Sequence, residues 1–243
     1  MEMKKIRVRG IPAILWGDPS DRLILAAHGS HSSKIDDCIW ILAEEAVPIG
    51  FQILSFDLPQ HGERVYETEP LMPGECVREL QILYAFARER AREISLFGCS
   101  MGAYFQLLAF PHTPVRQALF LSPVTDMERL IRNQMESCHI TEEMLRRQQQ
   151  IETGTEPLYY PYYDYVRRHP ITLWPHETHL LRGEGDTLCE AAFVRDFAGR
   201  FGCSLTEQPG GEHWFHTPEE LAFFRAWLRE KLPVSRWNAP AGG

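Results

Sequence analysis

The chain has 243 residues, of which 44% are hydrophobic and 24% are charged, as in an ordinary soluble globular protein. Its formal net charge of −8 argues against nucleic acid or an anionic membrane as a partner, because both attract clustered Lys and Arg. The opening MEMKKIRVRG has no apolar stretch behind it, so no signal peptide is expected, and no apolar run approaches the ~18 residues of a membrane span.

The cysteines favour a cytoplasmic location. Six are scattered along the sequence without a CxxC pair, at Cys38, Cys76, Cys99, Cys138, Cys189 and Cys203. In a chain of this length without a signal peptide, they are expected to be reduced thiols.

Short apolar runs that do not alternate predict strands buried on both faces of a parallel sheet. They follow an N-terminal hairpin, predicted from KKIRVRG and AILWG, which meet around Gly10 and Pro12. The runs cover 23–28, 51–57, 93–98, 117–122 and 178–183. A more polar run at 203–208 predicts an edge strand.

Helical patterns lie between these runs. Apolar residues fall on one face in two of them, at Ile35, Ile39, Leu42, Ala43 and Ala46 and at Val77, Leu80, Leu83, Tyr84 and Ala87. Thr217-Pro218-Glu219-Glu220 is a capping box that opens an amphipathic helix through Leu232. The alternation of strand and helix predicts an α/β fold with a mostly parallel central sheet flanked by helices.

One segment breaks this alternation. More than fifty residues separate LFLSP from THLLRG, where a plain crossover needs far fewer. The stretches MERLIRNQMES and TEEMLRRQQQIE within it predict helices. We therefore expect one domain over 1–243 with an inserted helical lid at 124–176, and a frayed end at WNAPAGG, residues 237–243.

A serine lies between two glycines in Gly98-Cys99-Ser100-Met101-Gly102, after a predicted strand and before a predicted helix. That context is the one a nucleophile elbow requires. The turn is so tight that the residues two before and two after the serine must be almost free of side chain. Cys99 is expected to be a small apolar side chain packed under this turn.

With further motifs in the expected order, the sequence resembles the α/β-hydrolase superfamily from Leu23 to about Leu228. Besides the serine motif, these are His28-Gly29, Asp57-Leu58-Pro59-Gln60-His61-Gly62-Glu63, Gly183-Glu184-Gly185-Asp186 and Gly211-Glu212-His213-Trp214-Phe215. Their chain order, serine then acid then histidine, is the order this fold uses.

The chemistry that the resemblance implies is nucleophilic catalysis by Ser100. A serine hydroxyl needs an imidazole to remove its proton, and that imidazole needs a carboxylate to orient it, roles that fall to His213 and Asp186. By the family's pattern, the amides of Met101 and Ser30 form the oxyanion hole.

Alternatives remain for two of these roles. His216, three residues beyond His213, could be the base, and Asp126 could be the acid, because some relatives place the carboxylate after that earlier strand. A metal at His28, His31 and His61 is not expected, because H-x-x-H on a loop lacks a helical metal-site context. The absence of GxGxxG and P-loop motifs means that no cofactor is expected.

Five of the eight tyrosines lie within 159–165. As substrate-binding residues we expect Tyr159, Tyr160, Tyr162, Tyr163 and Trp174, although the same rings could simply pack the insertion onto the core. Rigid rings suit short-chain or aromatic-acid esters better than long lipid chains.

The expected activity is hydrolysis of small-molecule carboxylic esters through an acyl-enzyme. A thioesterase, a lactonase or a peptidase of the prolyl aminopeptidase type could use the same triad. The peptidase would need an acidic anchor such as Glu152, Glu156 or Asp164. A non-catalytic binding protein ranks lower because all three triad residues are present. The oligomeric state stays open, with a homodimer as one option.

Overall fold

The computed structural model describes residues 1–232, so the expectation for 237–243 lies outside the described residues. Its main sheet has eight strands in the order β1-β2-β4-β3-β5-β6-β9-β10. They are β1 (Met3–Val8), β2 (Ile11–Trp16), β3 (Arg22–Ala27), β4 (Gln52–Phe56), β5 (Glu93–Cys99), β6 (Ala118–Leu121), β9 (Thr178–Gly183) and β10 (Ser204–Gln208). Each predicted strand run is therefore confirmed, and the polar run forms the edge strand β10.

The first two strands run against the rest of the sheet. β1 and β2 form the predicted antiparallel hairpin, and β2 also pairs antiparallel with β4. From β4 to β10 every neighbouring pair is parallel. The carboxyl ends of these parallel strands therefore share one edge, where His28, Asp57, Ser100 and the 184–186 turn emerge.

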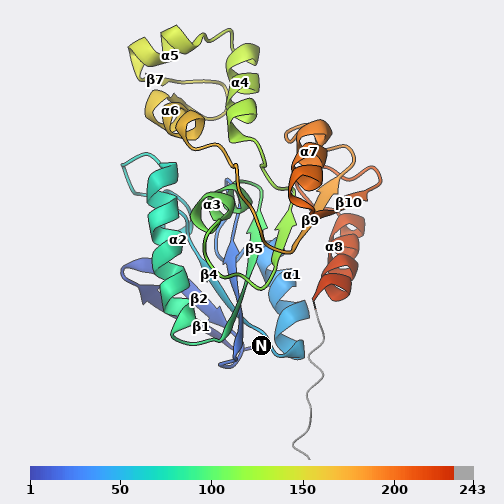
Figure 1. Cartoon of the computed structure of the whole chain (residues 1–243). Coiled ribbons are helices and arrows are strands. Elements are labelled where there is room, and N and C mark those ends of the chain that lie inside the picture. The colour runs from blue at the N-terminus through green and yellow to red at the C-terminus, as the bar shows by residue number, and fades with distance from the viewer. Residues whose placement is uncertain (233–243) are drawn as a thin grey trace, which may run out of the picture.

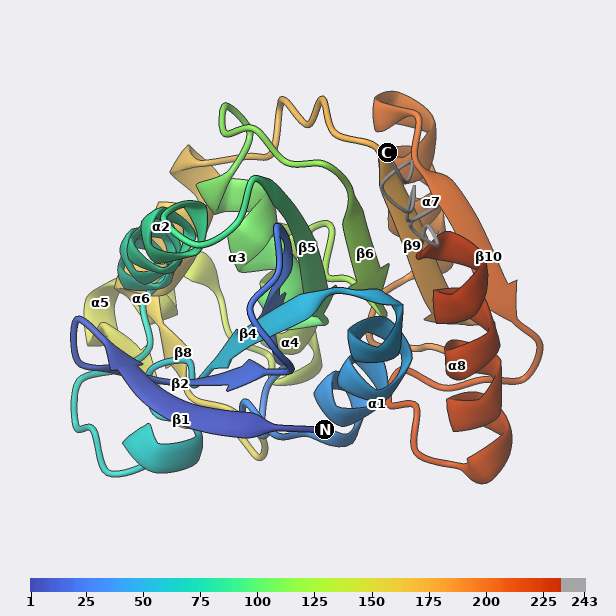
Figure 2. The same cartoon turned by 90° about the horizontal axis from the view of Figure 1, so that it is seen from below.

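Helices cover both faces of the sheet (Figures 1 and 2). On one face lie α1 (Asp37–Ala46) and α8 (Pro218–Lys231), and on the other lie α2 (Pro73–Arg88), α3 (Met101–Ala109) and α7 (Ala191–Phe201). Along β3, Leu23 and Leu25 join one apolar core while Ile24 joins the other. This two-sided burial is why the strand runs are apolar without alternating.

The segment between β6 and β9 forms α4 (Met127–Ser137), α5 (Glu142–Gln148), a short hairpin of β7 (Gln150–Ile151) and β8 (Leu158–Tyr159), and α6 (Tyr160–Arg168). Figure 1 shows these helices gathered at the end of the sheet where β6 leaves it. Buried side chains such as Ile131 and Leu145 join the same apolar core as α2 and α3. The two predicted helices of this segment are confirmed as α4 and α5.

Two further facts concern the described chain as a whole. All six cysteines carry free thiols. Within residues 1–232, no helix combines the length and the apolar character that a membrane crossing requires.

Candidate active site

Ser100 occupies a strained turn between β5 and α3. Its φ of 49° and ψ of −117° are values that side-chain-bearing residues rarely adopt. A Cβ on Gly98 would lie 2.6 Å from Cα of Ala103, and one on Gly102 would lie 2.4 Å from the carbonyl oxygen of His28. Only glycine fits at either position, which is the packing reason for the GxSxG pattern.

The structure brings Ser100 together with His213 and Asp186. Nε2 of His213 lies 2.9 Å from Oγ of Ser100, and its Nδ1 lies 2.8 Å from Oδ2 of Asp186. Because a carboxylate only accepts, Nδ1 carries the proton and Nε2 accepts from the serine hydroxyl. The arrangement can therefore remove the serine proton and stabilise the imidazolium that results.

The Asp186 carboxylate is fixed on its other side as well. Its Oδ1 accepts hydrogen bonds from the amides of Leu188 and Cys189, both at 2.9 Å. The carboxyl side chain is fully buried, whereas that of His213 is 20% exposed. The acid is thus held out of water while the histidine stays reachable from outside.

The alternative base and acid lie elsewhere. The ring of His216 stacks on Trp214 at 4.6 Å, and its Nδ1 donates to the Trp214 carbonyl at 2.7 Å. Asp126 caps α4, accepting from the amide of Arg129 at 2.9 Å. Within residues 1–232, neither residue makes a hydrogen bond or ion pair with Ser100 or His213.

A residue that sequence reasoning assigned only to a helix cap also holds the loop of His213. Glu220 accepts from the amides of Glu212 at 2.9 Å, His216 at 3.1 Å and Thr217 at 2.9 Å. Burial alone would raise its pKa, but these hydrogen bonds outweigh burial and lower the pKa to about 2. Glu220 therefore stays charged and fixes both ends of the turn that carries His213.

The two amides expected to form the oxyanion hole are free to do so. Within residues 1–232, neither the Ser30 nor the Met101 amide donates a hydrogen bond to another residue. A Cβ on Gly29 would lie 3.2 Å from Cβ of Ser100, so the loop that carries Ser30 runs against the elbow. The serine at the start of α3 also places Met101 at a helix N-terminus, which favours a developing negative charge.

His28 fixes the start of this loop. Its Nδ1 donates to the carbonyl of Gly29 at 2.7 Å, and its Nε2 accepts from the amide of Leu58 at 3.1 Å. Burial lowers the pKa of His28 to about 4, so the ring is neutral near pH 7. With both nitrogens committed, His28 has none left for a metal ion.

A buried ion pair ties the same loop to the one after β4. Asp57 accepts from the amide of Lys34 at 2.9 Å and also binds the Lys34 ammonium group, which lies 3.0 Å from Glu63. A Cβ on Gly62 would lie 2.2 Å from Oδ1 of Asp57. These contacts explain the DLPQHG motif, because its residues hold the loop that carries Ser30 in place.

His31, another histidine of this loop region, contacts the insertion. Nε2 of His31 lies 2.5 Å from Oε1 of Glu156, which stands between β7 and β8. His31 has a φ of 55°, directly after Ser30. The insertion is thereby joined to the loop that carries one of the two free amides.

The aromatic residues expected to bind substrate lie in different surroundings. Trp174 is 2% exposed and donates to the Thr178 hydroxyl at 2.7 Å, at the amino end of β9 and so at the opposite edge of the sheet from Ser100. Tyr163 is 1% exposed, with Arg132 and Arg167 over its ring at 5.9 and 5.5 Å. The structure therefore places Trp174 away from Ser100, and Tyr163 packs inside the insertion.

The other three tyrosines are half-buried. Tyr160 and Tyr162 pack against the core shared by α2 and α3, and Tyr159 pairs with Gln150 in the small hairpin. Burial raises the pKa of the Tyr162 hydroxyl. No hydrogen bond within residues 1–232 joins any of the three to Ser100 or His213.

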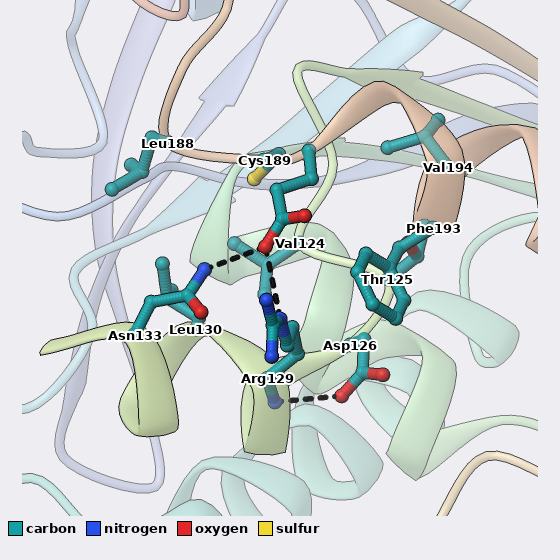
Figure 3. Close-up of a pocket in the computed structure, with 11 residues that line it drawn as sticks. Val124, Thr125, Asp126, Arg129, Leu130, Asn133, Leu188, Cys189, Phe193 and Val194 are labelled. Carbon is teal, nitrogen blue, oxygen red and sulfur yellow. Dashed lines mark hydrogen bonds and ion pairs between the residues drawn. The ribbon is translucent and has the colours of Figure 1, made fainter. Parts of the chain in front are cut away.

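A small cavity lies on the acid side of the site, between α4, α7 and the turn after Asp186. Its volume is about 20 Å³, enough for one or two water molecules. Figure 3 shows Leu188 and Cys189 facing Leu130 and Asn133 of α4 across it. Glu190 also lines it and accepts hydrogen bonds from Asn133 at 2.7 Å and from Arg129 at 2.9 Å.

Asp186, Cys189 and His213 bring three possible metal-ligand atoms within 4.8 Å of one another. Burial, together with the nearby charge of Asp186, raises the pKa of the Cys189 thiol, so it is not a thiolate. His213 and Asp186 are already hydrogen-bonded to each other. The donor set therefore does not fit a metal ion.

Strand order, parallel crossovers and the strained serine at the carboxyl edge of β5 define the α/β-hydrolase fold, as the resemblance implied. No family model matches the sequence, and no curated protein matches it. Solved structures do match it over almost its whole length.

Among these structures is Est1E from Butyrivibrio proteoclasticus with ferulic acid bound, at 16% identity and a TM-score of 0.77, covering 93% of this chain and 96% of that one. Mouse alpha/beta hydrolase domain-containing protein 10 matches at 14% identity and a TM-score of 0.74, covering 95% of this chain and 98% of that one. XC6422 from Xanthomonas campestris is described as a serine hydrolase without a lid. It matches at 15% identity and a TM-score of 0.66, covering 100% of this chain and 98% of that one. The chain shares the fold of these proteins.

Proposed function

We propose that the chain is a serine hydrolase that cleaves carboxylic esters through an acyl-enzyme intermediate. The observation that carries this proposal is the continuous hydrogen-bonded series Ser100–His213–Asp186 at 2.9 and 2.8 Å. The strained backbone of Ser100 supports it, because strain of this kind collects at functional sites.

In the proposed reaction, Nε2 of His213 takes the proton of Ser100 as Oγ attacks the ester carbonyl. The free amides of Ser30 and Met101 stabilise the oxyanion. His213 then gives its proton to the departing alcohol, which leaves an acyl group on Ser100. Water, deprotonated by His213, attacks that acyl group. The bond between the acyl carbon and Oγ of Ser100 then breaks, His213 returns the proton to Oγ, and the acid is released.

We infer a preference for short-chain or aromatic-acid esters over long-chain lipids. A long acyl chain needs an apolar groove, but Met127, Ile131, Met135 and Leu145 of the insertion are buried in the apolar core that the insertion shares with α2 and α3. The fold neighbour Est1E was solved with an aromatic acid, ferulic acid. Tyr159, Tyr160 and Tyr162 remain candidates for contact with such an acid.

The same proposal makes segment 124–176 a lid over the site within one domain spanning the chain. Its start after β6 and its contact with His31 support this role. The six free thiols support a cytoplasmic setting.

The surroundings of the acidic residues disfavour an aminopeptidase. Glu156 pairs with His31, Asp164 with Arg168, and Glu152 accepts from Gln150 at 2.7 Å. Glu156 and Asp164 are therefore already paired with other side chains, which leaves Glu152 as the one of the three that could anchor a substrate ammonium group.

The test combines covalent labelling with a substrate panel. An organophosphonate ester should label Ser100 alone, and Ser100→Ala should abolish labelling and turnover, while Ser137→Ala on the far end of α4 should change neither. The panel should contain acetyl, butyryl, cinnamoyl and palmitoyl esters, a thioester and an aminoacyl amide. Labelling of Ser100→Ala, or faster turnover of the amide than of every ester, would reject the proposal.

A further inference from the structure

We propose that a second cavity, between α3, α6 and α7, binds a small organic cation that carries one aromatic ring. The cavity has a volume of about 190 Å³. This binding site is separate from the proposed ester hydrolysis, since neither Ser100 nor His213 lines it.

The cavity has a buried floor and an exposed rim. Tyr104 of α3, Val166 of α6 and Phe197 of α7 form the floor, and each is at most 4% exposed. His169 and Asp196 lie on the exposed rim. A ligand can therefore enter from the solvent and bury an apolar group.

The floor contains a polar group without a partner. The Tyr104 side chain is 2% exposed, and its hydroxyl has no hydrogen-bond partner within residues 1–232. An unsatisfied buried hydroxyl is costly, and native proteins rarely keep one without a bound water or ligand. A ligand with an N–H donor would satisfy this oxygen.

The charges around the cavity favour a cation. Glu128 is paired with Arg132 at 2.8 Å, and Asp196 with Arg200 at 3.7 Å. Asp126 uses Oδ1 to cap α4 and makes no ion pair within residues 1–232. Its second oxygen is therefore not used in an ion pair and can face a cationic ligand. The rim histidine is held by its own hydrogen bond to the Tyr165 carbonyl at 2.7 Å.

The volume of the cavity and its lining residues indicate the size of the ligand and its aromatic ring. An engineered apolar cavity of ~150 Å³ binds benzene, so 190 Å³ accommodates one ring with a short ammonium arm. Phe193 and Phe197 line the cavity and supply aromatic carbon for contact with the ligand's ring. The ligand class that fits is a single-ring arylalkylammonium ion.

The probe is 2-phenylethylammonium, titrated calorimetrically into the full chain, with 3-phenylpropionate as the anion of similar shape and 2-phenylethanol as the neutral analogue. The amine should bind with a one-to-one stoichiometry and the anion should not. Ser100→Ala should leave the Kd within about twofold, because the site does not include the serine.

Two substitutions test the contacts. Asp126→Asn should weaken amine binding by about tenfold or more, and Tyr104→Phe by about three- to tenfold, as for the loss of a charged and a neutral hydrogen bond. Asparagine still caps a helix, so α4 should persist in the first variant, which circular dichroism can verify. Glu136→Gln, exposed on the same helix away from the cavity, is the matched control.

The proposal is overturned if the amine and the carboxylate bind alike, or if neither Asp126→Asn nor Tyr104→Phe changes the Kd in a folded variant. Loss of binding in Ser100→Ala would place the amine at the serine instead and would also overturn it. If the ester proposal fails, the binding results can still be interpreted, because none of these measurements depends on ester turnover.

Discussion

Nε2 of His213 lies within hydrogen-bond distance of Oγ of Ser100, although 113 residues separate them in the chain. The two side chains come from different loops on the carboxyl edge of the sheet, one after β5 and one after β10. Whether they work together is open to direct test.

Replacing His213 by alanine should lower kcat by about a thousandfold or more, because members of a triad act as a unit. His216→Ala should have little effect, since its ring is engaged with Trp214. Steady-state hydrolysis of 4-nitrophenyl acetate measures both. A small effect at 213 beside a large effect at 216 would mean that the base is misassigned.

Asp186→Asn should keep the fold but lower kcat by up to ~10⁴, because asparagine presents His213 with the wrong tautomer. Asp126→Asn should lower kcat for the same substrate only slightly, since asparagine can still cap α4. If kcat falls strongly in Asp126→Asn and only slightly in Asp186→Asn, the catalytic acid is the residue after β6 and not the one after β9.

Gly102→Ala should destabilise the protein by roughly 1–3 kcal/mol and impair turnover, because the new methyl group meets the carbonyl oxygens of Ala27 and His28 at 2.6 and 2.4 Å. Gly199→Ala is the control: it lies in α7, and nothing is within 4 Å of a Cβ there. That change should stabilise by up to ~1 kcal/mol. Urea unfolding distinguishes the two, and a stable, active Gly102→Ala would contradict the packing described for the elbow.

Glu220→Gln should remove a pH-dependent part of the stability. The pKa of Glu220 is lowered from 4.5 to about 2 in the folded chain, so its contribution is present above pH 4.5 and is lost as the pH falls towards 2. The contribution at pH 7 is on the order of 3 kcal/mol.

Unfolding free energies measured between pH 7 and pH 2 should therefore fall less steeply in Glu220→Gln than in the parent. Glu219→Gln, exposed in the same helical turn, is the matched control and should follow the parent. Equal slopes in all three proteins would show that the carboxylate does not hold the loop as described.

The strands could be predicted because each is buried on both faces, which leaves a plain apolar run in the sequence. Ser100, Asp186 and His213, which the structure brings together, could be picked out because glycines and strand ends mark their positions. The capping box of Thr217 and Glu220 was also predictable, and the structure confirms it. That Glu220 reaches back to the amide of Glu212 could not be read from the sequence, since this contact depends on how the loop returns to the helix.

The insertion was the least predictable part. A run of tyrosines does not show which partner each ring will meet. Trp174 is assigned to the site because it follows that run, but the chain has by then returned to the amino edge of the sheet, where Thr178 begins β9. Lys34 gave no sequence signal, because a loop lysine is ordinarily solvated and its partner Asp57 comes from another strand.

The late position of Asp186, His213 and Glu220 has a consequence for the newly made chain. Protein synthesis runs from the N-terminus, and Ser100 leaves the ribosome more than a hundred residues before the imidazole that lies beside it. Until β10 has paired and the first turn of α8 has formed, the loop of His213 is not held beside Ser100. If His213 is the base, as proposed, an ester cannot acylate Ser100 of a nascent chain before these later elements have folded.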